Sequence, residues 1–417
     1  MPRWATMPLG DLCDVIGGGT PAKNRAAYYA GNIPWATVRD MRSEHITETE
    51  FRITKEAVKS SATNIIPAGN VVIATRVGLG KVCTIAQDTA INQDLRGVVP
   101  KDVRRLSVRF LFWWLKSVAP VIVAKGTGAT VQGVKLPFIK SLEIPLIPLP
   151  EQQRIVAILD EAFAGIATAK ANAEKNLQNA REIFESQLQS VFTERGMRWD
   201  RLTLETLLER GWIKSHLDGN HGSDYPRKDE FISGGVPYIS ANCIDGERVD
   251  MTRAKYLSPS RAALLRKGIA KDNDVLFAHN ATVGPVAILH TDEPKVILGT
   301  SLTYYRCNLK HILPEYLAHY MRSFGFKSQY SQVMKQSTRN QVPITKQREF
   351  FHVIPPLEEQ KNIVGALDGL WENGRRLERI YERKLAALDA LKKSLLHRAF
   401  AGELTAGSAA KLVEAVA

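Results

Sequence analysis

The chain has 417 residues, too many for one ordinary hydrophobic core, so its length predicts two or three domains. A composition of 44% hydrophobic and 24% charged residues is typical of a well-folded globular protein. The excess of 56 Lys and Arg over 43 Asp and Glu indicates a polyanionic partner, most commonly nucleic acid, although a basic protein without such a partner is the alternative.

Cysteines and apolar runs argue against several other classes of protein. Cys13, Cys83, Cys243 and Cys307 form no CxxC pair, which indicates neither a zinc site nor a disulfide framework and fits a reducing cytoplasm. The first residues, MPRWATMPLGDL, lack the apolar run of a signal peptide, and no apolar stretch is long enough to cross a bilayer. We therefore expect a cytoplasmic protein without membrane contact.

The first segment, 1–147, is predicted to be globular. Residues 70–76 read as a strand, followed by Gly80 and a second apolar run at 82–86, which is the pattern of strand, glycine turn and strand. An aromatic-rich helical stretch follows at 108–117. A proline-rich run at 144–150, IPLIPLP, then precedes a helix at 148–196.

The second half of the chain repeats this plan. EQQRIVAILD at 151–160 matches EQKNIVGALD at 359–368, an offset that is half the chain length and that continues without a gap to 192 and 400. A second globular segment, 197–354, has matching apolar runs at 274–280 and 286–289 around Gly284, and a helical stretch at 314–333. A second helix at 355–405 and a tail at 406–417 complete the predicted domains.

The two helical segments carry apolar stripes in steps of three and four, the pattern of a coiled coil. Each helix of about 40 residues is about 60 Å long and needs a partner for its stripe. We expect the two helices to pack antiparallel, whereas packing of each stripe on its own globular domain is the alternative. The predicted seams are Ile155, Leu159, Ala162, Ile166, Ala169, Ala173, Asn176, Ala180, Ile183 and Gln187, and Ile363, Leu367, Leu370, Gly374, Leu377, Tyr381, Lys384, Leu388, Leu391 and Leu395.

Positive charge is concentrated in the globular segments. Residues 1–147 carry a net +8 and residues 198–354 a net +6, while the rest of the chain carries a net −1. If phosphate is the partner, the globular segments contact it and the helices space them.

Catalytic signatures are missing from the sequence. It contains no GxxxxGK[ST] loop, no HExxH motif and no Asn-Pro-Pro-aromatic tetrad of amino-methyltransferases. His216 and His221 lack a third ligand and are weak evidence for a metal site. The segment 292–295 is interpreted as an acidic turn between strands, and a nuclease-like set of carboxylates and lysine is the alternative. We therefore expect no enzyme activity, no cofactor and no metal in this chain.

Five motifs together resemble the specificity subunits of Type I restriction–modification enzymes. They are PLPEQQRIV at 148–156, PPLEEQKNIV at 355–364, KKSLLHRAFAGEL at 392–404, GGTP at 18–21 and GNHGSDYP at 219–226. The resemblance covers nearly the whole chain, and the ordered duplication is more specific than any single motif. The first half departs from the pattern at 186–192, where it has SQLQSVF and the second half has SLLHRAF.

The resemblance implies an α+β fold with two mixed α/β target-recognition domains, separated by two long helices that form an antiparallel coiled coil in an internal pseudo-twofold repeat. It also implies that each domain reads one half of a bipartite double-stranded DNA site. Two methyltransferase subunits and two restriction subunits are the implied protein partners. S-adenosylmethionine, ATP and Mg belong to those partners.

Candidate DNA-binding residues are loop side chains that match the donors and acceptors of base edges. For each of them a solvated loop or turn role is the alternative. In the first domain they are Thr20, Lys23, Asn24, Arg25, Arg39, Arg76, Lys125, Thr127 and Thr130. In the second they are Asn220, His221, Ser223, Asn242, His279, Asn280, Ser337, Thr338, Arg339 and Asn340.

Arg76 and Asn280 occupy matching places, each directly after a strand and before a glycine. Arginine suits guanine and asparagine suits adenine by bidentate geometry, and a phosphate contact or a loop hydrogen bond is the alternative at each position. Trp113 and Trp114 lie in an apolar helical run and are interpreted as core residues.

Two other classes of function remain as alternatives. A fused restriction–methylation enzyme would need the methyltransferase and ATPase motifs that the sequence lacks. A coiled-coil scaffold for protein partners alone would not need positive charge confined to the globular segments.

Overall fold

The computed structural model describes residues 4–128, 133–195, 199–336 and 340–404. The chain divides into two compact units, Met1–Glu174 with Arg383–Ala417, and Lys175–Glu382. Each unit therefore combines one globular domain with part of each long helix.

The first unit contains two larger sheets and a small one. Its five-stranded sheet has the order β2 (Cys13–Gly17), β10 (Leu95–Pro100), β7 (Val71–Ala74), β8 (Val82–Ile85) and β4 (His45–Ile46). Its four-stranded sheet has the order β5 (Phe51–Ile53), β3 (Ile33–Ala36), β9 (Thr89–Ile91) and β6 (Asn64–Ile66), and β1 (Thr6–Pro8) pairs with β11 (Glu143–Pro145). The short helices are α1 (Leu9–Leu12), α2 (Lys55–Lys59) and α4 (Leu136–Lys140), and α3 spans Val108–Ala124.

The second unit repeats this topology. Its six-stranded sheet has the order β13 (Ile213–Asp218), β23 (Leu302–Cys307), β20 (Val275–Asn280), β21 (Thr282–Ile288), β17 (Arg248–Val249) and β16 (Ile244–Asp245). Its five-stranded sheet has the order β14 (Phe231–Ile232), β18 (Lys255–Leu257), β15 (Val236–Ile239), β22 (Val296–Leu298) and β19 (Ile269–Ala270), and β12 (Asp200–Thr203) pairs with β24 (Phe351–Ile354). Without β16 and β14, the strand order equals that of the first unit, including the parallel pairs β4–β8 and β17–β21.

The helices of the second unit are α6 (Leu204–Glu209), α7 (Pro259–Leu264), α8 (Pro314–Arg322), α9 (Phe324–Lys335) and α10 (Ile344–Gln347). The predicted helical stretch at 314–333 is thus two helices, because Ser323 between them has an extended backbone, with φ −68° and ψ 159°. In the first unit, α3 continues past the predicted end at 117 to Ala124.

Strand alternation explains how each unit builds its layers. Val71 and Ile73 of β7 pack on one side of the sheet with the aromatic residues of α3, whereas Val72 and Ala74 pack on the other side with the second sheet. Strand β20 behaves in the same way, since Phe277 and Leu276 belong to different clusters. Trp113 and Trp114 are 1% and 2% exposed, which confirms them as core residues.

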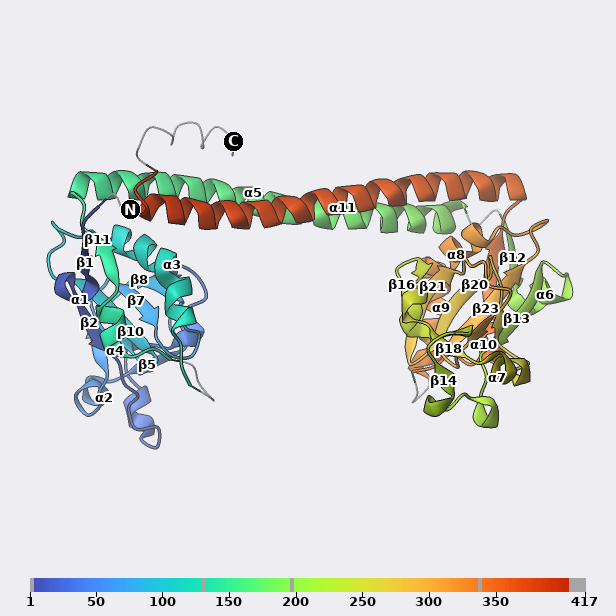
Figure 1. Cartoon of the computed structure of the whole chain (residues 1–417), viewed down its shortest axis with the longest axis horizontal. Coiled ribbons are helices and arrows are strands. Elements are labelled where there is room, and N and C mark those ends of the chain that lie inside the picture. The colour runs from blue at the N-terminus through green and yellow to red at the C-terminus, as the bar shows by residue number, and fades with distance from the viewer. Residues whose placement is uncertain (1–3, 129–132, 196–198, 337–339, 405–417) are drawn as a thin grey trace. The chain divides into compact units, whose positions relative to one another are not determined.

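The long helices are α5 (Leu149–Ser190), which continues as a π-helical turn (Val191–Arg195), and α11 (Leu357–Phe400). They lie antiparallel within each unit (Figure 1). In the first unit Lys170 forms a 2.7 Å ion pair with Asp389, and Lys392 lies 4.9 Å from the ring of Phe163. In the second, Arg181 contacts Glu378 at 3.3 Å, and Phe184 packs against Trp371.

Both predicted modes of helix packing occur together. Ile155, Leu159 and Ile166 of α5 and Leu388 and Leu395 of α11 share one cluster with the core of the first globular domain. In the first unit, residues of both stripes therefore face the other helix and the globular domain at once.

The predicted seam of α5 is wrong in its last turns. Ile183 is 52% exposed and Gln187 is also exposed, whereas Ala180, Phe184, Leu188 and Phe192 are buried. Steps of four move the buried stripe around the helix, so that Phe192 reaches Tyr316 and Tyr320 of α8. The aromatic residues of the globular domain decide the register there.

A buried glutamine joins each long helix to its domain. The amide nitrogen of Gln152, which is 1% exposed, donates to the carbonyls of Arg105 (2.7 Å) and Ile147 (3.0 Å), and its side-chain oxygen accepts from the amide of Ser107 (2.9 Å). Gln360 makes the same contacts with His311, Pro355 and Leu313. These bonds explain the repeated EQ motif.

Replacing Gln152 by Ala should lower the free energy of unfolding of the first unit by about 3 kcal/mol, because three backbone groups lose a buried partner. The neighbouring exposed Gln153→Ala is the matched control and should change it by less than about 0.5 kcal/mol. Hydrogen exchange of peptides from α3 during urea denaturation measures both. Equal protection in the two variants would contradict the structural role of Gln152.

Candidate nucleic-acid interface

Arg76 lies at the end of β7, where the chain turns toward β8. The amide of Thr75 donates to the carbonyl of Asp94 at 2.9 Å, and the carbonyl of Thr75 accepts from the amide of Val134 at 2.9 Å. The Arg76 side chain itself is 48% exposed and forms a 3.6 Å ion pair with Asp94. The turn is thus held on two sides while its arginine faces solvent.

A string of polar side chains continues from Arg76. The hydroxyl of Thr20 donates to the side-chain oxygen of Gln93, and the amide of Gln93 donates to Asp94 at 3.5 Å. Asn92 fixes the same carboxylate by a 3.0 Å hydrogen bond from its amide. Thr20 and Arg76, which are distant in the sequence, therefore belong to one polar surface.

Glycine allows this surface to form. A Cβ atom on Gly18 would lie 2.1 Å from the carbonyl oxygen of Asn92, so only glycine permits the GGTP segment to run along residues 91–92. Gly219 has the same role in the second unit, where a Cβ would lie 2.2 Å from the carbonyl of Gly299.

Two further predicted regions lie next to the Arg76 turn. Gly78 sits directly against Val38, which begins the short helical turn Val38–Asp40 that carries Arg39. Arg39 has a 75% exposed side chain and contacts Glu50 at 3.6 Å. On the other side, Thr127 pairs with Gly133 through two 3.0 Å backbone hydrogen bonds, and Gly133 packs on the side chain of Arg76.

The remaining predicted residues of the first unit are exposed. Lys125 ends α3, and Lys23 and Asn24 lie in the loop after GGTP. Arg25 donates a 2.6 Å hydrogen bond to the hydroxyl of Tyr28. The prediction at Thr130 falls outside the described residues.

The second unit has the same arrangement with different side chains: a turn that follows a strand and is held by two backbone hydrogen bonds. We call this arrangement the corner of each unit. Asn280 ends β20, and Ala281 follows with a φ of +64°. The amide of His279 donates to the carbonyl of Ser301 at 2.9 Å, and its carbonyl accepts from the amide of Val342 at 2.8 Å, as Thr75 does with Asp94 and Val134. Asn340 is exposed and bonds to the backbone of Ala281 through both its carbonyl and its side-chain amide.

A buried polar network lies behind this corner. The side-chain oxygen of Gln347 accepts from Thr303 (3.0 Å) and Tyr305 (3.1 Å) and lies 3.1 Å from Nε2 of His216. Its amide donates to the carbonyl of Val342 at 3.2 Å, which also lies 2.9 Å from Nδ1 of His279. The network therefore fixes the segment that follows Asn340.

Burial lowers the pKa of the two histidines in this network and of His352, whose ring lies near that of Tyr305. Desolvation lowers the pKa of His216 to about 3, despite the opposing bond to Gln347, and lowers the pKa of His352 to about 4. The pKa of His279 is also lowered, mainly by burial.

Other predicted residues of the second unit differ in accessibility. His221 is exposed and pairs with Asp218 at 2.6 Å, and Asn242 is exposed on a short turn whose amide at Ala241 donates to Ser301. Asn220 and His279 are only 2% and 1% exposed, and the Asn220 amide bonds to the carbonyl of Lys267. Both side chains are occupied inside the domain. Ser337, Thr338, Arg339 and the side chain of Ser223 fall outside the described residues.

Sequence reasoning did not select Gln93, Asp94, Arg96, Ser301 or Gln347. The sequence signal for Gln93 and Asp94 is the polar run 92–94 between two buried strands. Such a run is unusual unless it lies at a sheet edge. Arg96 adds a second guanidinium there, and its pKa is lowered by burial first and then by the charge of Arg76. Gln347 has no comparable local signal.

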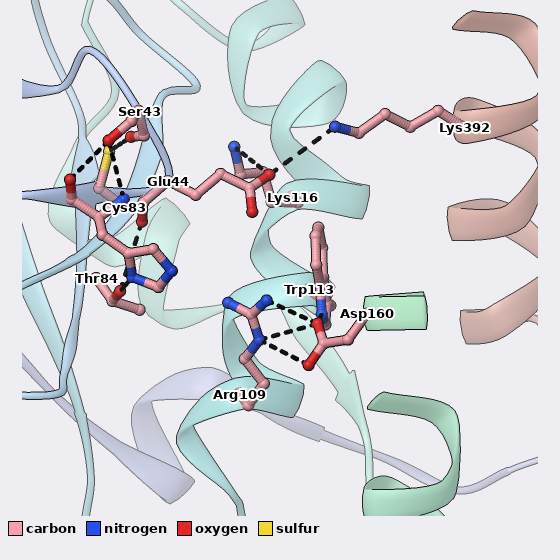
Figure 2. Close-up of polar contacts among 10 residues, drawn as sticks. Ser43, Glu44, Cys83, Thr84, Arg109, Trp113, Lys116, Asp160 and Lys392 are labelled. Atoms are coloured by element: carbon pink, nitrogen blue, oxygen red, sulfur yellow. Dashed lines mark hydrogen bonds and ion pairs between the residues drawn. The ribbon is translucent and has the colours of Figure 1, made fainter. Parts of the chain in front are cut away.

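The globular domain of the first unit also contacts both long helices through charged groups. Figure 2 shows Arg109 and Trp113 of α3 converging on Asp160 of α5, with distances of 2.7 Å from both side chains to the same carboxylate oxygen. Glu44 lies 3.8 Å from Lys116 of α3 and 3.8 Å from Lys392 of α11. These contacts hold the first globular domain to both helices.

The second unit has counterparts to these contacts. His319 of α8 lies 2.8 Å from Asp368, the repeat equivalent of Asp160. Arg322 forms a 2.6 Å ion pair with Glu247, as Lys116 contacts Glu44. Both units thus anchor the helix beneath the sheet, α3 or α8, to the same aspartate of the repeated motif.

Within the described ranges, no group of three or more His, Cys, Asp or Glu residues could hold a metal ion. No described helix is long and apolar enough to span a membrane. The arrangement is that of a duplicated polar binding surface, each copy built from a strand turn, a following loop and a short helical turn.

Comparison with known proteins agrees with a duplicated nucleic-acid interface. The family model of the Type I restriction modification DNA specificity domain matches residues 1–178 and 220–382. The chain belongs to this family.

Curated relatives are similar over parts of their length. The specificity subunit of the Type I restriction enzyme EcoR124I/EcoR124II of Escherichia coli is 36% identical over 38% of this chain and 40% of its own. The MjaIX specificity subunit of Methanocaldococcus jannaschii is 25% identical over 57% of each chain. The chain thus spans about half the length of these relatives. The EcoKI specificity subunit of Escherichia coli is 22% identical over 97% of this chain and 89% of its own.

Solved structures show the same fold. A chain from a study of complex assembly and conformational transition of the type I R-M system has a TM-score of 0.76 at 19% identity, covering 97% of this chain and 99% of that one. The HsdS subunit of Thermoanaerobacter tengcongensis has a TM-score of 0.63 at 20% identity, covering 97% and 98%.

Acid should destabilise the second unit selectively. His216 stays neutral in the folded state down to about pH 3, whereas the unfolded chain takes up the proton near its ordinary value of 6.5. The contribution of His216 to the free energy of unfolding is therefore fully present above pH 6.5. It decreases as the pH falls below that value, by about 2 kcal/mol at pH 5. The described part of the first unit buries no histidine and is the internal control. Hydrogen exchange at pH 7.5 and 5, corrected for intrinsic rates, would contradict this if both units changed alike.

Proposed function

We propose that this chain is the sequence-specific DNA-binding specificity subunit of a Type I restriction–modification complex, and that each unit reads one half of a bipartite double-stranded site. The observation that carries the proposal is the duplicated corner. Thr75 and His279 are held by the same two backbone hydrogen bonds, while the side chains that follow them, the exposed Arg76 and the half-buried Asn280, differ.

Identical scaffolds with different polar residues are suited to two different half-sites. The first corner offers Arg76 with Asp94 and Thr127, and the second offers Asn280 with Ser301 and Asn340. Guanidinium, carboxylate, amide and hydroxyl groups match different base-edge patterns, so an asymmetric site is expected. The net charges of +8 and +6 on the two globular segments supply the phosphate attraction that positioning requires.

The proposed DNA-facing residues are those of the predicted set that the structure leaves accessible. They are Thr20, Lys23, Asn24, Arg25, Arg39, Arg76, Lys125, Thr127, His221, Asn242, Asn280 and Asn340. Thr20 and Asn280 are half-buried, and Thr20 acts through Gln93 or directly, while the others are exposed.

Catalysis, in this proposal, belongs to partner subunits. Two methyltransferase subunits and two restriction subunits would bind S-adenosylmethionine, ATP and Mg, and this chain would direct them to the site. Adenine methylation in a duplex requires base flipping, so the methyltransferase must be held beside the recognised bases. The lack of nucleotide-loop and amino-methyltransferase motifs in the sequence supports this division.

The two globular segments should exchange as modules. Replacing residues 1–147 by the matching segment of a relative should change one half of the methylated motif and leave the other half intact, because each corner is complete within its own unit. Methylome sequencing of a host carrying the hybrid measures this. A change in both halves would contradict independent reading.

The isolated chain should transfer no methyl group. Incubation of the purified full chain with labelled S-adenosylmethionine and host DNA should give no labelled DNA, whereas adding the methyltransferase subunits should restore labelling. Labelling by the chain alone would contradict the proposed division of roles.

A further inference from the structure

The contacts around Arg76 distinguish a base reader from a phosphate clamp. Its aliphatic part is covered by Gly133, whose Cβ position would lie 3.2 Å from Cγ of Arg76. Its Nε atom faces the Asp94 carboxylate, with 3.6 Å between Nε and Oδ1. With the stem and the Nε side both occupied, the two terminal Nη groups are the donors left for a ligand.

Asp94 is itself rigid. Its carboxylate accepts from the amide of Asn92 at 3.0 Å, and its backbone amide donates back to the side-chain oxygen of Asn92 at 3.1 Å. The side chain is only 14% exposed. An arginine that lies beside a fixed carboxylate has fewer orientations open to its guanidinium before the ligand arrives, which lowers the entropy cost of a bidentate contact.

The charge of Asp94 also selects the kind of ligand. A phosphate approaching Arg76 would meet a carboxylate beside it, which offsets part of the attraction that Arg76 and the neighbouring Arg96 exert. A guanine edge is neutral and offers two acceptors, N7 and O6, to a pair of Nη donors. The paired arginine therefore favours a base edge over the backbone.

The second unit supports this interpretation, because neutral residues occupy the positions that match Arg76 and Asp94. The position of Asp94 is held by Ser301, whose carbonyl accepts from His279 as that of Asp94 accepts from Thr75. The position of Arg76 is held by Asn280. Where the exposed side chain is neutral, its neighbour is neutral too.

We propose that Arg76 reads a guanine in the half-site of the first unit, and that Asp94 is the positioning residue that presents its guanidinium and excludes phosphate. This inference rests on the proposed function and names the base that one of its residues recognises.

The test uses the full chain together with the subunits that co-purify with it from its host, and a randomised duplex DNA library. Wild type should select a two-part motif with a guanine in one half. Arg76→Lys keeps the positive charge but lacks the planar fork, so it should lower the preference for that guanine about tenfold or more. Asp94→Asn should weaken the preference at the same position only.

Non-specific binding provides the readout that a structural role would not move. On a single unselected duplex measured at several salt concentrations, Asp94→Asn should bind as well as wild type or better, since a negative charge is removed from the surface. The matched control is Asp102→Asn. Asp102 is another aspartate paired with an arginine, and it lies before the N-terminal end of α3, whereas Lys125 follows the C-terminal end. It should leave the selected motif unchanged.

Each other result counts against the inference. A uniform loss for Arg76→Lys or Asp94→Asn across the library would assign Arg76 to phosphate, and unchanged motifs would remove it from the interface. If the folded wild-type assembly selects no motif, the proposed function itself fails. Thermal unfolding of each variant separates loss of reading from loss of fold.

Discussion

The packing of the two long helices against each other and against the globular domains is the constraint on which the rest depends. The core of the first unit includes Leu388, Leu395 and Ala399 from the end of the chain as well as Phe110 and Trp113 of α3. That unit is therefore discontinuous in sequence and closes only when α11 is in place. Buried apolar contact of this kind supplies most of the stability of long amphipathic helices.

The repeated glutamine and aspartate of the helices give this packing its register. Gln152 and Gln360 bond to the backbone just before α3 and α8, and Asp160 and Asp368 bond to side chains on those helices. The glutamines are buried, and buried polar groups are costly unless every partner is present, so they favour one arrangement over slipped ones. The aspartate contacts differ, since Arg109 and Trp113 are replaced by His319, while the glutamine contacts are the same.

The recognition surface is separated physically from this scaffold. Backbone hydrogen bonds to Thr75 and His279 hold the two turns, and the exposed residues that follow are free to differ without loss of the fold. In the proposed function this surface contacts DNA and needs positive charge, and a carboxylate such as Asp94 within it is unfavourable for phosphate binding. The proposed role of Asp94 beside the Arg76 guanidinium accounts for its presence.

The sequence by itself determined the duplication, the paired long helices, the aromatic core at Trp113 and Trp114, and the turns that carry Arg76 and Asn280, because periodicity and an ungapped repeat are local properties. It also predicted most of the accessible polar residues of the two corners. Only the tertiary structure decided that Asn220 and His279 are buried, that Phe184 and Leu188 replace Ile183 and Gln187 in the packing of α5, and that Asp94 and Gln347 support the corners. Those outcomes depend on contacts between segments that are far apart in the sequence. Such contacts, and not the residue type, decide which side chains are buried.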